Sequence, residues 1–166
     1  MTTARDSIVE HIPGLRRYAR SLVGDAHRAD DLVQDCLERA LGRWHLWGGW
    51  GSLRAWLFTI MHNLHANGVR RRVAEPPLVR LEEAVRVSEP ARQLDYVAMR
   101  ETLVSLAALP EEQREVLLLV AVEGLTYEEV ARVQGVAIGT VMSRLSRARA
   151  RMREAVGEGP RLRRVK

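Results

Sequence analysis

The sequence predicts an all-α fold: two small helical domains joined by a flexible linker, the C-terminal one containing a helix-turn-helix. Apolar residues recur at spacings of three and four, and no stretch shows sustained period-2 alternation. One proline-containing stretch lacks this pattern. A chain of 166 residues accommodates one ordinary domain or two small ones. We therefore expect domains at 1–72 and 95–156, a linker at 73–94 and a basic tail at 157–166.

Three apolar stripes predict three helices in the N-terminal domain. The first stripe lies in 15–22, the second in 32–44 and the third in 53–64. Gly24 followed by Asp25 is typical of a helix end and a new helix start. A glycine-rich interruption at 47–52 separates the second stripe from the third. These features give a compact helical unit with well-defined breaks.

Prolines mark the linker and the start of the second domain. Pro76 and Pro77 lie close to the start of the aperiodic stretch and Pro90 lies near its end, where they disfavour a helix. A second helical unit begins near residue 94 and breaks at Pro110. Two glutamates follow in the first turn of the next helix, where carboxylates are favoured by the helix dipole. This helix is expected to end near Gly124.

The segment after 125 has the spacing of a helix-turn-helix. Thr126 and Glu129 have capping-box spacing at the start of its first helix. Gly135 supplies the left-handed conformation that the turn requires. A small residue is expected at Ala131, where the helices cross, and Val130 and Val141 are expected to fill the wedge between them. The sequence therefore predicts a helix-turn-helix here.

Charge is segregated along the C-terminal domain. Residues 138–153 hold five arginines and no acid, whereas residues 111–129 have a net charge of −5. The whole chain has a net charge of +5, and all its basic residues except Lys166 are arginine. An exposed basic helix behind an acidic one is typical of a DNA major-groove reader. The alternative is a solvated helix hairpin that ends in arginines.

An acidic segment stands out in this basic chain. Residues 25–38 have a net charge of −4. Such a face disfavours DNA and favours a basic protein partner, and Asp31, Gln34 and Asp35 share it by their spacing. The alternative for each residue is a solubilising polar surface.

Tryptophans and arginines point to single-stranded DNA and phosphate. Trp47 and Trp50 lie among glycines and suit either packing or stacking on a base, whereas Trp44 and Trp56 continue apolar stripes and belong to the core. Asn63 lies beyond its stripe, where an amide can contact a base edge. Basic residues for phosphate contact follow at Arg70, Arg71 and Arg72.

Other reactive residues predict no catalytic or metal chemistry. His62 and His65 are three apart, but no carboxylate accompanies them at useful spacing, so we expect surface or DNA-proximal histidines. Cys36, the one cysteine, excludes an internal disulfide and is expected in the core rather than as a redox sensor. We expect no enzyme activity, no cofactor and no metal. The lack of a signal peptide or a membrane span favours the cytoplasm.

Several segments together resemble the extracytoplasmic-function (ECF) group of bacterial sigma factors. They are 30–41, 53–64, 70–72, 109–114, 124–131 and 139–144, within a resemblance that covers about residues 8–155. It implies core polymerase binding through Asp31, Gln34, Asp35 and Glu38. It implies −10 DNA binding through Trp47, Trp50, Asn63, Arg70, Arg71 and Arg72. It implies −35 DNA binding through Tyr127, Glu128, Gly139, Thr140, Ser143, Arg144, Arg147 and Arg149. Met142 and Ser146 depart from the basic and aromatic residues common in the family.

The resemblance implies an alternative sigma factor that directs promoter-specific initiation, in a stress response under anti-sigma control. Its partners would be core RNA polymerase, the −35 duplex, the −10 single strand and an anti-sigma factor, with no insertion into the membrane. The linker predicts independent domain motion in the free protein. Two alternatives remain: a stand-alone helix-turn-helix repressor, and a sigma-like mimic that acts by protein contacts, as an anti-anti-sigma factor does.

Overall fold

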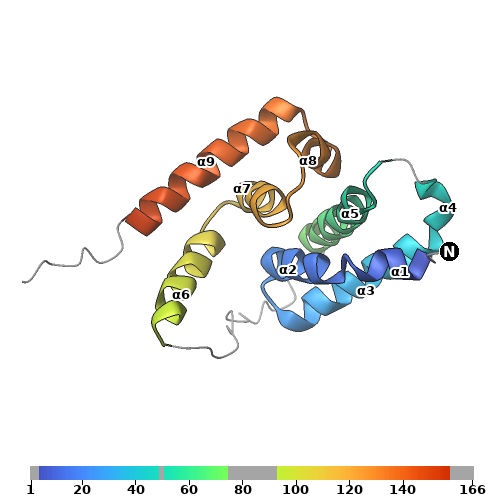
Figure 1. The fold of residues 1–166 in the computed structure, drawn as a ribbon, viewed down its shortest axis with the longest axis horizontal. Helices are drawn as coiled ribbons and strands as arrows, with labels where there is room; N and C mark the ends of the chain where they lie inside the picture. The colour runs from blue at the N-terminus through green and yellow to red at the C-terminus, as the bar shows by residue number, and fades with distance from the viewer. Residues whose placement is uncertain (1–3, 49–50, 75–92, 158–166) are drawn as a thin grey trace, which may run out of the picture.

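The computed structural model describes residues 4–48, 51–74 and 93–157, and these residues contain helices and no strand (Figure 1). The all-α prediction is therefore confirmed. The N-terminal half contains α1 (Ala4–Val9), α2 (Ile12–Val23), α3 (Ala26–Gly42), α4 (Trp44–Trp47) and α5 (Leu53–Ala74). The C-terminal half contains α6 (Gln93–Ala107), α7 (Glu111–Leu117), the π-helix η1 (Leu118–Val122), α8 (Tyr127–Gln134) and α9 (Ile138–Gly157). Most of the predicted linker and the basic tail lie outside the described residues.

Helices α2, α3 and α5 form the N-terminal domain, and local signals set their ends. Gly24 ends α2 in the left-handed region, with φ at 71°. Asp25 then caps α3, since its side chain accepts a 2.8 Å hydrogen bond from the backbone N–H of Arg28. The first stripe is buried as predicted, and Tyr18 packs edge-on against Phe58 with ring centroids 5.3 Å apart.

Helices α8 and α9 form the predicted helix-turn-helix. Thr126 and Glu129 make both hydrogen bonds of the capping box, at 3.2 and 2.9 Å. Gly135 is left-handed, with φ at 65°. Val130 and Val141 are fully buried between the helices. The turn is therefore fixed by residues within ten positions of it.

The end of the preceding helix differs from an ordinary α-helix. The Glu123 N–H bonds the Leu118 carbonyl five residues earlier, which is the hydrogen-bond pattern of a π-helix. Gly124 follows in the left-handed region, close to the predicted helix end. Glu123 itself is 2% exposed, so this turn delivers a carboxylate to the interior.

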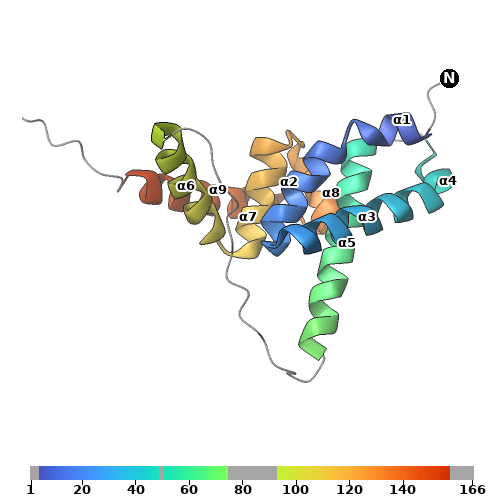
Figure 2. The ribbon, with the colours of Figure 1, turned by 90° about the horizontal axis from the view of Figure 1, so that it is seen from below.

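The two halves of the chain pack against each other. Helix α8 lies on α5, and α7 lies on α2 (Figures 1 and 2). One apolar cluster includes Leu15 and Phe58 from the N-terminal half and Val116 and Leu119 from the C-terminal half. In this arrangement apolar contact and ion pairs join the two domains, and independent domain motion in the free protein stays a prediction. The acidic segment 111–129 is not all surface either, since Glu115 and Glu123 are buried.

Candidate nucleic-acid interface

The acidic face of α3 is presented to solvent. Its four predicted polymerase-binding residues are all exposed, and the Gln34 amide donates a 3.0 Å hydrogen bond to Glu38. Asp31 and Asp35 also line an open groove of about 1000 Å³ between α3 and α5. Arg70 and Arg71 line the same groove. The structure thus brings two predicted polymerase contacts beside two predicted phosphate contacts.

The predicted −10 residues separate into exposed and packed groups. Asn63, Arg70 and Arg71 are exposed on α5. Trp47 is half-buried against Trp44, with ring centroids 5.1 Å apart, and its indole N–H is buried without a hydrogen-bond partner. The packed alternative for Trp47 therefore describes this structure. Trp50 and the side chain of Arg72 lie outside the described residues.

Most of the predicted −35 residues lie on the exposed side of the helix-turn-helix. Exposed members are Glu128, Gly139, Ser143, Arg147 and Arg149, and half-buried ones are Tyr127 and Thr140. A hollow of about 270 Å³ on this side is lined by Tyr127, Arg149 and the two departures from the family pattern, Met142 and Ser146. Met142 is 53% exposed. The departures thus lie beside candidate DNA contacts and not in the core.

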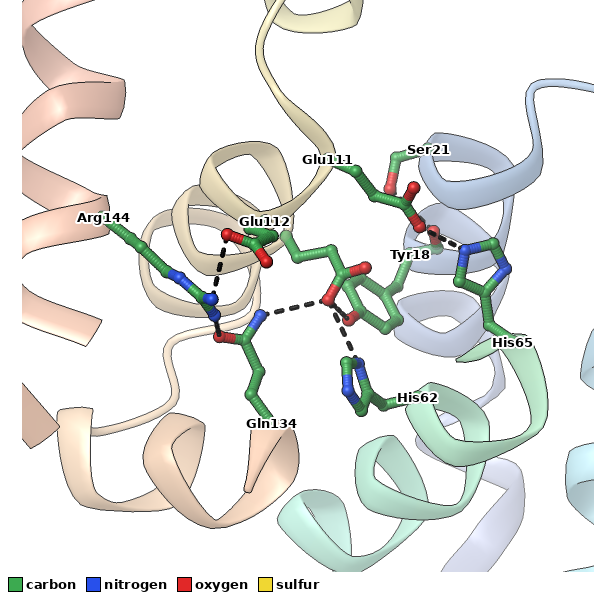
Figure 3. A network of polar contacts seen from close by, with 9 residues as sticks. Tyr18, Ser21, His62, His65, Glu111, Glu112, Gln134 and Arg144 are labelled. Atoms are coloured by element: carbon green, nitrogen blue, oxygen red, sulfur yellow. Dashed lines mark hydrogen bonds and ion pairs between the residues drawn. The ribbon is translucent and has the colours of Figure 1, made fainter. Parts of the chain in front are cut away.

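Arg144 differs from the other arginines of α9. Its side chain is only 19% exposed, because two neighbours hold its guanidinium (Figure 3). Glu112 contacts it at 2.9 Å, and the Gln134 amide oxygen accepts a hydrogen bond from it at 3.2 Å. Arg144 is therefore tethered within the C-terminal domain.

Gln134 continues this chain of contacts toward the N-terminal domain. Its amide donates a 3.0 Å hydrogen bond to Glu115, which is 4% exposed (Figure 3). The Glu115 carboxylate also accepts a 3.4 Å bond from the Tyr18 hydroxyl and lies 3.1 Å from Nδ1 of His62. A polar network thus runs from the helix-turn-helix into α2 and α5.

Both histidines of α5 make contacts at this domain boundary; the predicted surface position is wrong for His65, which is buried, whereas His62 is half-buried. His65 is 6% exposed and its Nε2 lies 2.5 Å from Glu111 (Figure 3). Burial by itself would raise the pKa of Glu115, but the hydrogen bond and charge of His62, with smaller contributions from Gln134 and His65, hold that pKa below its usual value. Burial, and then Glu115, raise the pKa of Tyr18.

A second group of contacts joins the domains at Glu123. Its carboxylate meets Arg17 Nε at 3.0 Å and Arg54 Nη2 at 2.6 Å. Gly14 lies so close that a Cβ there would be 2.6 Å from Glu123 Oε2. Sequence reasoning missed these residues, because Glu123 contributed only to a charge count and its partners carry no local motif.

Two family models match this chain, one in each half. Residues 8–62 match the family described as the Sigma2 domain of PhyR, and residues 100–152 match Sigma-70, region 4. The chain is 40% identical over 148 residues to the ECF RNA polymerase sigma factor EcfG of Rhodopseudomonas palustris strain TIE-1. This similarity covers 89% of the chain and 82% of that relative.

Solved structures show the same arrangement of helices. The sigma factor RpoE of Bartonella quintana, solved in complex with the anti-sigma factor NepR, matches with a TM-score of 0.80 and 33% identity, over 94% of this chain and 98% of that one. The anti-anti-sigma factor PhyR, solved with NepR of the same organism, matches with a TM-score of 0.59 over 92% of this chain and 50% of that one. Its 18% identity supports a shared fold alone.

Proposed function

The chain belongs to the family of ECF RNA polymerase sigma factors, and from this premise we propose that it binds core RNA polymerase and directs initiation at promoters with −35 and −10 elements. The observation that supports this most directly is the charge division of its exposed surface. An acidic face on α3 suits a basic protein surface, while a basic face on α9 suits DNA. A sigma factor needs both surfaces in one chain.

Core polymerase is the proposed partner of the α3 face. Asp31, Gln34, Asp35 and Glu38 would contact basic residues of the polymerase clamp helices. All four side chains are free to reach a partner, since they are exposed. Complementary charge at such a surface steers association and sets register.

Promoter DNA is the proposed partner of α5 and α9. Asn63 would contact a base of the −10 element, with Arg70 and Arg71 on phosphates. Arg147 and Arg149 are exposed on the helix that would enter the −35 major groove. Glu128, Gly139, Thr140, Ser143 and Arg144 complete the proposed −35 set with Tyr127.

An anti-sigma factor is the proposed regulator. The similar protein RpoE was solved with NepR, and we extend a regulator of that kind to this chain in a stress response.

No helix in the described part of the chain is long and apolar enough to cross a membrane. We place the protein in the cytoplasm with its polymerase, and we assign it no catalytic reaction of its own.

Two other functions would fit parts of this chain. A mimic such as PhyR would use the same fold without promoter contacts, but the exposed arginines of α9 and the intact helix-turn-helix favour DNA. A stand-alone repressor would leave the acidic face of α3 without a partner. Both alternatives predict no transcription with core polymerase.

In vitro transcription with purified core polymerase on a promoter library tests the proposal. We expect initiation at a defined set of promoters. The double variant Asp31→Arg, Asp35→Arg should lose core binding in a pull-down, because it reverses the charge of the face. The matched control is Glu10→Arg with Glu101→Arg, which makes the same charge change at exposed positions in the turn after α1 and on α6. Equal binding by both double variants would contradict the assignment of α3.

A further inference from the structure

Two histidines and two glutamates meet where the N-terminal and C-terminal domains join. His62 and His65 lie one turn apart on α5 (Figure 3), and Glu111 and Glu115 lie one turn apart on α7. None of these four residues belongs to the proposed polymerase or DNA surfaces. They form a separate cluster that the proposed function does not use.

Three of these residues have the geometry of metal ligands. The ligand atoms of His65, Glu111 and Glu115 all lie within 4.8 Å of one another. Two ligands of a tetrahedral Zn²⁺ ion lie about 3.3 Å apart, given metal–ligand bonds of about 2.0–2.2 Å. Here Nε2 of His65 and Oε1 of Glu111 are 2.5 Å apart and no pair of ligand atoms exceeds 4.8 Å, so the separations bracket that value. Nδ1 of His62 lies 3.1 Å from Glu115, and His62 is placed to orient that carboxylate.

Burial and charge favour a cation at this position. His65 and Glu115 are 6% and 4% exposed, and Nδ1 of His65 is buried without a hydrogen-bond partner, whereas Nδ1 of His62 lies 3.1 Å from Glu115. Within the described residues, no arginine pairs with Glu111 or Glu115. Their partners are imidazoles, an amide and a hydroxyl, and an imidazole is charged only when it is protonated. A divalent cation would supply the positive charge that two neighbouring carboxylates need.

We propose that His65, Glu111 and Glu115 bind a divalent transition-metal ion of the zinc class, with His62 orienting Glu115 and water in the fourth position. Nitrogen and carboxylate ligands with one open position are the set that Zn²⁺ takes at exchangeable sites. Because its ligands come from α5 and α7, the bound metal fastens the two domains in the packed arrangement. Gln134, which bonds both Glu115 and Arg144, extends this effect to the helix-turn-helix.

Titration of the full-length chain with Co²⁺ tests the site, because Co²⁺ bound at a low-symmetry site absorbs visible light. Zn²⁺ added afterwards should displace the Co²⁺ and abolish this absorption. We expect one Co²⁺ per chain. Glu111→Gln and His65→Gln should each weaken binding at least about tenfold, the loss typical of a disturbed metal site. The matched controls are Glu112→Gln, whose side chain contacts Arg144, and His45→Gln, whose side chain is exposed on α4. Both controls should bind as the parent does.

Domain closure gives a second measurement that needs neither polymerase nor promoter. Fluorophores on exposed positions of α3 and α9 should report a narrower distance distribution when Zn²⁺ is added to the parent, and no change in Glu111→Gln. Glu111 is 46% exposed, so this variant is expected to fold, which circular dichroism verifies. Absence of Co²⁺ absorption in the parent, or equal affinity in Glu111→Gln and Glu112→Gln, would overturn the metal site. Failure of in vitro transcription would leave these results intact, so the two proposals are tested separately.

Discussion

Arg54 of α5 donates a 2.6 Å hydrogen bond to Glu123, and this contact joins the two domains at a carboxylate whose side chain is 1% exposed. The Arg54 side chain is 38% exposed, so the pair lies at the edge of the interface with the acid on the inside. A buried carboxylate is tolerated because Arg54 and Arg17 both reach it. Glu123 therefore links the C-terminal domain to both α2 and α5 through ion pairs.

Glu123→Gln should loosen the packing of the two domains. It removes the charge that compensates Arg17 and Arg54 and leaves the shape nearly unchanged. We expect a loss of about 1–3 kcal/mol, less than for a fully buried pair because both arginines are partly exposed. Small-angle scattering should show a larger radius of gyration, and urea unfolding should show a lower midpoint. Glu101→Gln, at an exposed position on α6, serves as the control and should change neither.

Gly14→Ala should disturb the same contact from the other side. A Cβ at this position would lie 2.6 Å from Glu123 Oε2, so the carboxylate must shift away from its arginines. Alanine in a helix is otherwise favoured over glycine by about 0.5–1 kcal/mol. The direction in which the unfolding midpoint moves therefore shows which of the two effects is larger. A lower unfolding midpoint would show that close approach outweighs helix propensity. A higher midpoint, with domain packing retained, would contradict the close approach.

The Cys36 thiol should be unreactive in the folded chain. It is fully buried, and burial raises its pKa to about 12. Reaction with a disulfide reagent at pH 8 should therefore be slow and should accelerate on addition of denaturant. The raised pKa also means that Cys36 adds no pH dependence to stability below about pH 9 and lowers stability as the pH rises from about 9 toward 12, because its thiol ionises there only in the unfolded chain. Rapid labelling without unfolding would restore the redox-sensor alternative.

Local signals explain how much of the fold the sequence predicts. The helix end at Gly24, the cap at Asp25 and the capping box at Thr126 each depend on residues within four positions of one another, and the structure has all three. The apolar stripes likewise fix which helix faces are buried. The stripes can be recognised in the sequence because they repeat at the period of the helix.

The contacts between the domains were not predictable in this way. Glu111 meets His65 across 46 residues, and Glu123 meets Arg17 across 106. No period or motif relates such pairs, so the sequence alone predicts surface histidines and one continuous acidic segment. The π-helical turn that places Glu123 also lacks a sequence signal. The candidate surface residues were easier to predict, because helix periodicity indicates which side chains are exposed and the residue types give their charge.

The contact between Glu112 and Arg144 predicts how removal of the Glu112 charge changes DNA binding by the proposed −35 surface. Glu112 is 70% exposed and holds the guanidinium at 2.9 Å, where it competes with promoter DNA for the same side chain. Glu112→Gln should therefore strengthen binding of the holoenzyme to promoter duplex. The gain should be at most about fivefold, because an exposed pair contributes about 0–1 kcal/mol.

Two arginine variants separate this contact from general attraction to phosphate. Arg144→Ala should abolish the gain from Glu112→Gln and, if the arginine meets a base edge, cost about 1–3 kcal/mol at one promoter position. Arg147→Ala, at an exposed residue without such a partner in the described structure, should weaken all sequences alike and lower the salt slope by about 1. Binding titrations across salt concentrations measure both effects. Weaker binding by Glu112→Gln would mean that Glu112 positions Arg144 for DNA instead of competing with it, because a competitor can only raise affinity when its charge is removed.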